Sequence, residues 1–130
     1  MGMQVLLDHS DENNGTTCFG MYPGTVKNFS VEFNNRQHDG LKVPHMGWNT
    51  IQSVTDHPLW EGIPQNSYFY FVHSYFVQPD DEEDIAGSTD YIVSFAAAVA
   101  RENVFATQFH PEKSQHAGLQ LLKNFLQWQP

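Results

Sequence analysis

The stretch Ser67-Tyr-Phe-Tyr-Phe-Val-His-Ser-Tyr-Phe-Val77 carries the strongest strand signal in this chain. Aromatic and β-branched residues dominate it, and such residues are enriched in strands. Further strand patterns are expected around it, at 16–22, 24–33, 42–55, 91–100 and 104–109. Arg101-Glu102-Asn103 separates the last two patterns and predicts a hairpin. The sequence therefore predicts a protein built mostly of strands.

Helical patterns stand on both sides of these strands. Residues 2–12 begin with apolar side chains and then become polar, which predicts a short helix. Residues 117–128 predict an amphipathic helix whose apolar stripe contains Leu119, Leu122, Phe125 and Leu126. Residues 57–62 predict one helical turn. Turns are expected at 23–24 and 34–40, a loop at 44–47, and an acidic loop at 79–87 with 80–84 in solvent.

Composition limits the classes of function. The chain has 130 residues, a net charge of −9 and six lysines and arginines, so it lacks the basic surface that nucleic acid or an anionic membrane requires. Its one cysteine excludes an internal disulfide and suits a reducing compartment. No apolar run approaches 18 residues and no signal pattern opens the chain. We therefore expect a cytoplasmic protein with no membrane or nucleic-acid partner.

The segment Phe109-His110-Pro111-Glu112-Lys113 is a candidate catalytic segment. In extended backbone, His110 and Glu112 would point to the same side, where the carboxylate could hold the imidazole in one tautomer. Together they would form two thirds of a nucleophile–base–orienter arrangement. A loop pair without chemistry is the alternative. A metal pair is a further reading, but no third ligand has suitable spacing, so no metal is expected.

Three motifs in a fixed order are more specific. They are Lys42-Val43-Pro44-His45-Met46-Gly47-Trp48-Asn49, Tyr68-Phe69-Tyr70-Phe71-Val72-His73-Ser74-Tyr75 and Thr107-Gln108-Phe109-His110-Pro111-Glu112-Lys113-Ser114. Together they resemble the glutamine amidotransferase subunit of imidazole glycerol phosphate synthase, a class I glutamine amidotransferase of histidine biosynthesis. The resemblance covers nearly all of this chain and about the last two thirds of the family chain. It implies an incomplete α/β, flavodoxin-like domain at 1–130, mostly strands with an N-terminal and a C-terminal helix.

The resemblance also locates what this sequence lacks. In the family the nucleophile lies in a Gly-x-Cys-Leu-Gly-Met-Gln turn, and Gly2-Met3-Gln4 match its end while Met1 takes the place of the leucine. We therefore expect an N-terminally truncated form that lacks both the nucleophilic cysteine and the oxyanion loop, and that is inactive alone. Cys18 falls away from the nucleophile position and is expected to be a packed or half-exposed strand residue.

The family roles carry over to matching residues. His110 would shuttle a proton, and Glu112 would orient the imidazole ring of His110. Gln4 would contact the substrate glutamine, whose amino-acid end would be held by the backbone of His73, Ser74 and Tyr75. The surface for a barrel-type cyclase subunit would contain His45, Met46, Gly47, Trp48, Asn49, Tyr70 and Lys113. Read without the family, the same residues could be an exposed helix position, ordinary sheet residues and a tryptophan-anchored loop.

Two classes of function therefore remain open at this point. The first is part of a glutaminase that needs no cofactor and supplies ammonia for imidazole ring closure. The second is a non-catalytic remnant that docks on a cyclase or complements an N-terminal fragment, and an incomplete gene is a third reading. Uncovered apolar strands further predict a homodimer, formed by edge strands or by a swapped helix at 2–12. A compact monomer covered by the helix at 117–128 is the alternative.

Overall fold

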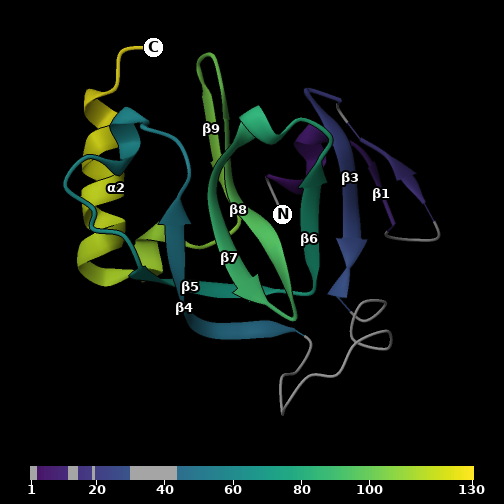
Figure 1. Ribbon diagram of the computed structural model, residues 1–130, viewed down its shortest axis with the longest axis horizontal. Coiled ribbons are helices and arrows are strands. Elements are labelled where there is room, and N and C mark those ends of the chain that lie inside the picture. The colour runs from purple at the N-terminus through teal and green to yellow at the C-terminus, as the bar shows by residue number, and fades with distance from the viewer. Residues whose placement is uncertain (1–2, 12–14, 19, 30–43) are drawn as a thin grey trace.

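A computed structural model describes residues 3–11, 15–18, 20–29 and 44–130 (Figure 1). Strands dominate these residues, and one α-helix, α2 (Gln115–Gln127), ends them. The strands are β1 (Leu7–Ser10), β2 (Thr16–Thr17), β3 (Tyr22–Asn28), β4 (His45–Ser53), β5 (Ser67–His73), β6 (Tyr75–Pro79), β7 (Ile85–Tyr91), β8 (Val93–Arg101) and β9 (Val104–Thr107). Short 3-10 helices are η1 (Gln4–Leu6), η3 (Pro58–Trp60), η4 (Glu82–Asp84) and η5 (Pro111–Lys113). The predicted turn at 34–40 lies outside the described residues, as do 30–33 and 42–43.

The strands form one mixed sheet in the order β2-β1-β3-β6-β8-β7-β4-β5, with β9 paired to β8. Within the described residues, β1 and β3 run parallel and every other pair of neighbours is antiparallel. Helix α2 stands at one end of this sheet, beside β4 and β5, and β1 and β3 stand at the other end (Figure 1). No helix in the described part of the chain is long and apolar enough to cross a membrane.

The predicted N-terminal helix is wrong. Its described part forms the 3-10 turn η1 and then strand β1, which pairs with β2 and β3. An isolated helix of about this length is marginal in water, because few hydrogen bonds offset the cost of its nucleus. Pairing on both sides of β1 satisfies the backbone instead, and Met3 and Leu7 are fully buried. Short apolar runs do not distinguish helix from strand by their period.

Three strand boundaries also differ from expectation. The predicted strand at 67–77 divides into β5 and β6 at Ser74, whose carbonyl accepts a hydrogen bond from the Phe29 amide at 3.0 Å. Strand β3 runs straight through the predicted turn at 23–24. Gly24 permits this because its φ is +146° and a Cβ there would lie 2.7 Å from the Cα of Pro79. Strand β4 begins at His45, inside the predicted loop. The β8–β9 hairpin and the turn η3 are confirmed.

The predicted acidic loop at 79–87 is wrong in part. Residues there form the end of β6, the turn η4 and the start of β7. Asp84 is buried and makes a two-pronged ion pair with Arg101, through Nε at 2.9 Å and Nη2 at 2.6 Å. Arg101 also lies over the ring of Tyr22, with its Cζ 5.4 Å from the ring centre. The partner for this buried carboxylate comes from the far end of β8, which a local charge pattern does not reveal.

Aromatic side chains fill the larger part of the core. Phe29, Phe69, Phe71, Phe76 and Phe95 are almost fully buried and pack with residues of β4, η3 and α2. A second cluster beneath η1 contains Met3, Leu7, Tyr22, Val26, Val77, Ala96 and Val99. Together the two clusters bring the first described residues of the chain against β6 and β8. They therefore place Gln4 beside the segment that contains Tyr75.

Candidate functional site

His110 and Glu112 are in direct contact. His110 Nδ1 lies 2.9 Å from Glu112 Oε1, and both side chains are partly open to solvent. The expected extended geometry is wrong, because Pro111 starts the 3-10 helix η5 and places Glu112 within it. Proline is favoured at this position because its fixed φ suits a first helical residue. The two side chains therefore meet across the start of a helical turn.

The backbone around His110 is held from both sides. Its amide donates to the Tyr70 carbonyl at 2.9 Å, and its carbonyl accepts from the Ser114 hydroxyl at 2.6 Å. The Ser114 Oγ in turn accepts from the Tyr70 amide at 3.0 Å. These bonds tie η5 to the outer edge of β5. They also cover part of an edge that would otherwise expose unpaired backbone groups.

The charge of Glu112 suits an orienting role. A hydrogen bond from its own backbone amide lowers the pKa of the Glu112 carboxyl, and the ring of His110 lowers it further. The carboxylate is therefore ionised at neutral pH. An ionised carboxylate accepts the N–H of Nδ1 and leaves Nε2 as the free basic nitrogen of a neutral ring. This is the arrangement that a general base requires.

Gln4 lies in a second, buried part of the candidate site. Its Nε2 donates to the Tyr75 carbonyl at 3.2 Å and to Gln108 Oε1 at 3.1 Å. Gln108 is also buried, and its backbone amide donates a hydrogen bond to the Ala97 carbonyl at 2.8 Å. We did not single out Gln108 from the sequence, although it lies two residues before His110 within a motif that we quoted. It is the residue that joins the Gln4 region to the His110 segment.

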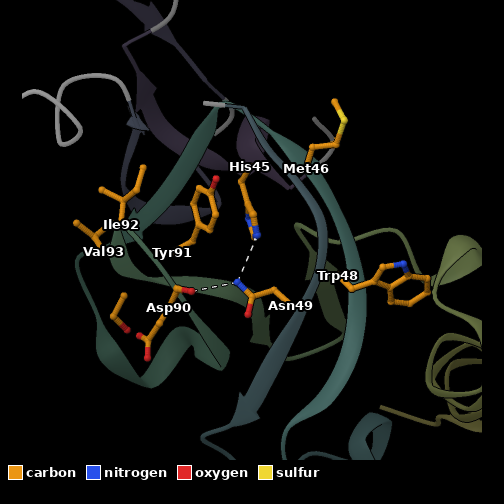
Figure 2. Close-up of a pocket in the computed structure, with 9 residues that line it drawn as sticks. His45, Met46, Trp48, Asn49, Asp90, Tyr91, Ile92 and Val93 are labelled. Atoms are coloured by element: carbon orange, nitrogen blue, oxygen red, sulfur yellow. Dashed lines mark hydrogen bonds between the residues drawn. The ribbon is translucent and has the colours of Figure 1, made fainter. Parts of the chain in front are cut away.

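His73 and His45 form a buried pair. His73 Nδ1 lies 2.7 Å from the Tyr75 carbonyl, and His73 Nε2 lies 2.9 Å from His45 Nδ1. This series of hydrogen bonds continues to the Asn49 side-chain amide, whose nitrogen lies 3.3 Å from His45 Nε2. Figure 2 shows His45 pointing toward Asn49 and lying alongside the Tyr91 ring. Ser74 contributes its carbonyl to Phe29, as described above.

Burial keeps both rings neutral. Burial, together with the charge that His73 can carry, lowers the pKa of His45 to about 3. Burial likewise lowers the pKa of His73 to about 4, although the Tyr75 carbonyl favours the charged form. A charge on His110 also lowers the pKa of His73, so the two rings are electrostatically coupled. Neither buried ring carries a charge at neutral pH.

The predicted partner-facing residues divide between two faces of β4. Met46 and Trp48 are exposed and point to the opposite side of the strand from His45 and Asn49 (Figure 2). Trp48 pairs across the ladder with Tyr70, their rings 5.9 Å apart, and Lys113 Nζ lies 6.0 Å from the Tyr70 ring centre. We call Met46, Trp48, Tyr68 and Tyr70 the aromatic face. Tyr68 was not singled out from the sequence, but strand alternation places it with Tyr70.

His45 is 3% exposed, so its side chain lies inside the protein and not on the aromatic face. Gly47 and Asn49 share the inner side of β4 with it, by the same alternation. Cys18 is half-exposed just after β2, and its thiol lies 3.7 Å from the Thr16 carbonyl. Strand β2 and strand β5 stand at opposite ends of the main strand order, and His110 is attached to β5.

The fold and these paired groups define a class of protein. Residues 1–128 match the family described as glutamine amidotransferase class-I, so the chain belongs to that family. Within the family it is homologous to the imidazole glycerol phosphate synthase subunit HisH. It is 56% identical to the Methylococcus capsulatus subunit over all of this chain and 55% identical to the Nitrosococcus oceani subunit over 98% of it. The chain spans 60% and 59% of the lengths of these relatives.

A solved structure supports the same fold. A putative GMP synthase component from Thermoplasma acidophilum superposes with a TM-score of 0.58 at 17% identity. The match covers 80% of this chain and 47% of that protein. The likeness concerns the fold alone. It agrees with the predicted flavodoxin-like α/β class, here mostly strands with one C-terminal helix.

Proposed function

We propose that this chain supplies the histidine–glutamate half of a glutaminase site, whose ammonia would serve imidazole ring closure in histidine biosynthesis. The observation that carries the proposal is the 2.9 Å contact between His110 Nδ1 and Glu112 Oε1. The relatives that match nearly all of the chain are HisH subunits of imidazole glycerol phosphate synthase. The proposed compartment is the cytoplasm, and the proposed chemistry needs no cofactor.

The proposed reaction divides the work between this chain and a cysteine outside it. His110 Nε2 takes the thiol proton, and the thiolate attacks the carboxamide carbon of glutamine. The carbon–nitrogen bond then breaks, and the imidazolium returns its proton to the leaving ammonia. His110 then deprotonates water, which attacks the thioester; the carbon–sulfur bond breaks to give glutamate, and the imidazolium returns its proton to the cysteine sulfur. Glu112 stabilises the imidazolium in both steps, and Gln4 with the Tyr75 backbone would hold the substrate.

The test adds the missing nucleophile. We expect the 130-residue chain to release no ammonia from glutamine, because its one cysteine lies beyond an edge strand. Mixing it with, or fusing it to, the N-terminal segment of a HisH relative that ends in Gly-x-Cys, so that Met1 follows in the place of the leucine, should restore ammonia release. Activity of the chain alone that disappears in His110→Ala would contradict the expected inactivity. An inert reconstituted protein with its cyclase present would contradict the glutaminase proposal.

Matched variants assign the roles within the reconstituted protein. Glu112→Gln keeps the size of the side chain and removes its charge, so kcat should fall by roughly 10²- to 10⁴-fold. The control is Glu61→Gln, which makes the same change on an exposed residue of another element. Equal activity in the two variants would remove Glu112 from the proposed site.

A docking role is the second candidate function, and the aromatic face favours it. Met46, Trp48 and Tyr68 are 63%, 46% and 61% exposed, and contiguous exposed apolar surface marks interaction sites. The proposed occupant is a barrel-type cyclase subunit, with Lys113 at the rim. Titration with a cyclase from the same source should show binding that Trp48→Ala weakens by at least tenfold. Leu126→Ala removes a still more exposed apolar side chain, on α2, and should leave this affinity unchanged.

Self-association is proposed as well, with a changed interface. Residues of the expected swapped helix pair internally through β1, and η5 covers part of the β5 edge. With the aromatic face assigned to the cyclase, the exposed apolar stripe of α2 is the surface that we propose for a two-fold contact. Sedimentation equilibrium at low micromolar concentration should give a dimer mass that Leu122→Glu converts to a monomer. A monomer mass for the unmodified chain would contradict the dimer.

A further inference from the structure

A directional series of hydrogen bonds ends at the Tyr75 carbonyl. A carbonyl oxygen only accepts, so His73 Nδ1, 2.7 Å away, must be the donor. A neutral imidazole has one N–H, which leaves His73 Nε2 as an acceptor. His45 Nδ1, 2.9 Å away, therefore donates to it, and His45 Nε2 becomes an acceptor in turn. Both rings are consequently in the Nδ1–H tautomer, and every bond in the chain points toward Tyr75.

The outer end of the chain is set by Asn49. Its Oδ1 accepts from the Thr50 amide at 2.8 Å, which identifies the other atom as the donor Nδ2. Nδ2 donates to the Asp90 carbonyl at 3.0 Å and faces His45 Nε2 at 3.3 Å. Asn49 also lines a pocket of about 580 Å³ between β4 and the β7–β8 turn (Figure 2). The chain therefore begins at a surface pocket.

The inner end of the chain reaches the candidate glutamine site. The Tyr75 carbonyl accepts both from His73 and from Gln4 Nε2, at 2.7 Å and 3.2 Å. Gln4 donates its second hydrogen to Gln108 Oε1. Any rotation of the Tyr75 peptide therefore alters two bonds at once. If the bond to Tyr75 is lost, Gln108 Oε1 is the acceptor that Gln4 Nε2 retains among the described hydrogen bonds.

Ring packing holds the two histidines in place. The His45 ring stacks on Tyr91 and Phe71, with centres 3.9 Å and 4.8 Å apart. The His73 ring meets the edge of Phe29 at 5.1 Å and Phe95 at 5.2 Å. Neither ring can turn without disturbing this aromatic core. If one of these hydrogen bonds reverses its direction, the other ring must therefore change its tautomer, because neither ring can rotate to restore the bond.

We propose that Asn49, His45 and His73 form a relay of positioning residues, which transmits the hydrogen-bonding state of the surface pocket to the Tyr75 carbonyl and Gln4. The relay deepens the proposed glutaminase function and rests on it for its consequence. Its existence is independent of that function. The lowered pKa values of both rings support it, because a neutral pair keeps one direction of donation.

The relay is tested first by ¹⁵N NMR of the histidine side chains in the 130-residue chain at pH 7. His45 and His73 should both show a protonated Nδ1 and an unprotonated Nε2. Exposed His116 is an internal reference for a ring in solvent. An Nε2–H form in either buried ring would overturn the proposed direction.

Asn49→Asp reverses the polarity at the outer end. A carboxylate cannot donate, so it should draw the proton of His45 to Nε2 and force a change at His73. The ¹⁵N signals of both histidine rings and of the Gln4 side-chain amide should all change in this variant. Asn49→Leu removes the donor without adding an acceptor, and should leave both tautomers unchanged. Gln52→Glu adds the same charge at an exposed position of β4 and is the control for charge alone. A change of the NMR signals of His45 alone in Asn49→Asp would overturn the relay.

The functional arm uses the reconstituted glutaminase without a cyclase. Asn49→Asp should raise KM for glutamine by roughly 2- to 30-fold, and Gln52→Glu should not. An inactive unmodified protein would count against the proposed function, while the NMR result would still decide the relay. An active protein in which Asn49→Asp moves both rings but leaves KM and kcat unchanged would overturn the positioning role.

Discussion

Helix α2 and the strand pair β4–β5 both bury polar groups, but they surround these groups in different ways. In α2 the apolar residues Leu119, Leu122, Phe125 and Leu126 are exposed, whereas Asn124 and Gly118 are buried. In β4–β5 the polar rings of His45 and His73 are buried among aromatic side chains. Both regions bury polar groups that find hydrogen-bond partners. They differ in the partners of these groups, because backbone carbonyls hold Asn124 whereas a second histidine and aromatic rings surround His45.

The buried face of α2 is selected by backbone fit. A Cβ at Gly118 would overlap the Pro111 carbonyl, so only glycine allows this close approach to η5. Asn124 Nδ2 donates to the Leu59 and Glu61 carbonyls at 2.8 Å and 2.7 Å. These contacts place Leu121 inward and turn the apolar stripe outward. An apolar stripe on a helix usually faces a core, so hydropathy alone favours the opposite orientation.

The largest expected effect concerns the histidine pair and pH. The folded state lowers the pKa of both rings from 6.5 to about 3 and about 4, so the unfolded chain binds more protons as pH falls below 6.5. Stability is fully present above pH 6.5 and is lost toward pH 4. Between pH 7 and pH 5 the loss should be about 4 kcal/mol, about 2 from each ring. Urea unfolding across this range measures it.

The control for the pH effect is His116→Gln, which removes an exposed ring and should leave the slope unchanged. Burial also lowers the pKa of His57, which adds a smaller loss of the same sign. A free energy of unfolding that stays level between pH 7 and pH 5 would mean that the histidine pair is not buried as a neutral unit.

The next effect tests the inward face of α2. Leu121→Ala should lower the free energy of unfolding by about 3 kcal/mol, because Leu121 is 3% exposed and truncation leaves a cavity. Urea denaturation with the slope held in common gives the value. If Leu121→Ala costs less than Leu122→Ala, the helix uses its apolar stripe for packing and the assigned face is wrong.

A smaller effect tests the polar anchor of the same face. Asn124→Leu keeps the shape of the side chain but leaves the Leu59 and Glu61 carbonyls without this donor, which should cost about 2 kcal/mol. Gln127→Leu makes the same kind of change at an exposed position of α2. The difference between the two melting temperatures isolates the buried hydrogen bonds, and equal melting temperatures would contradict them.

The smallest effect tests the outward stripe. Leu126 is 83% exposed, so Leu126→Ala should change the free energy of unfolding by less than about 0.5 kcal/mol at concentrations where the chain is monomeric. The comparison with Leu121→Ala uses one residue type on one helix. A cost above about 2 kcal/mol would place Leu126 in a core or in an interface that persists on dilution.

Several features could be predicted because they depend on neighbouring residues. The β8–β9 hairpin, the turn η3 and the existence of α2 follow from local apolar patterns and turn residues. The order of three motifs predicted the family that the comparisons confirm. The contact between His110 and Glu112 could be expected as well, although Pro111 changed the backbone geometry that produces it.

Other features depend on partners far apart in the sequence. Gln4 meets Gln108, 104 positions away, and Asp84 is neutralised by Arg101. The N-terminal segment becomes a strand because β3 and β2 accept its backbone groups, while its own sequence is compatible with a helix. The local sequence around a residue does not predict where such a distant partner will lie. Tertiary packing outweighs propensity wherever it supplies more hydrogen bonds and burial.

The sequence by itself determined the family, the strand-rich composition, the C-terminal helix and the residues of the proposed proton-transfer pair. The tertiary structure decided which face of α2 is buried, that His45 lies inside the protein, and that its ring connects Asn49 with His73 and Tyr75. The physical reason is that a residue type fixes which hydrogen bonds a side chain can make. Only the packed fold fixes which donors and acceptors come within about 3 Å of it, and whether water is there to replace them.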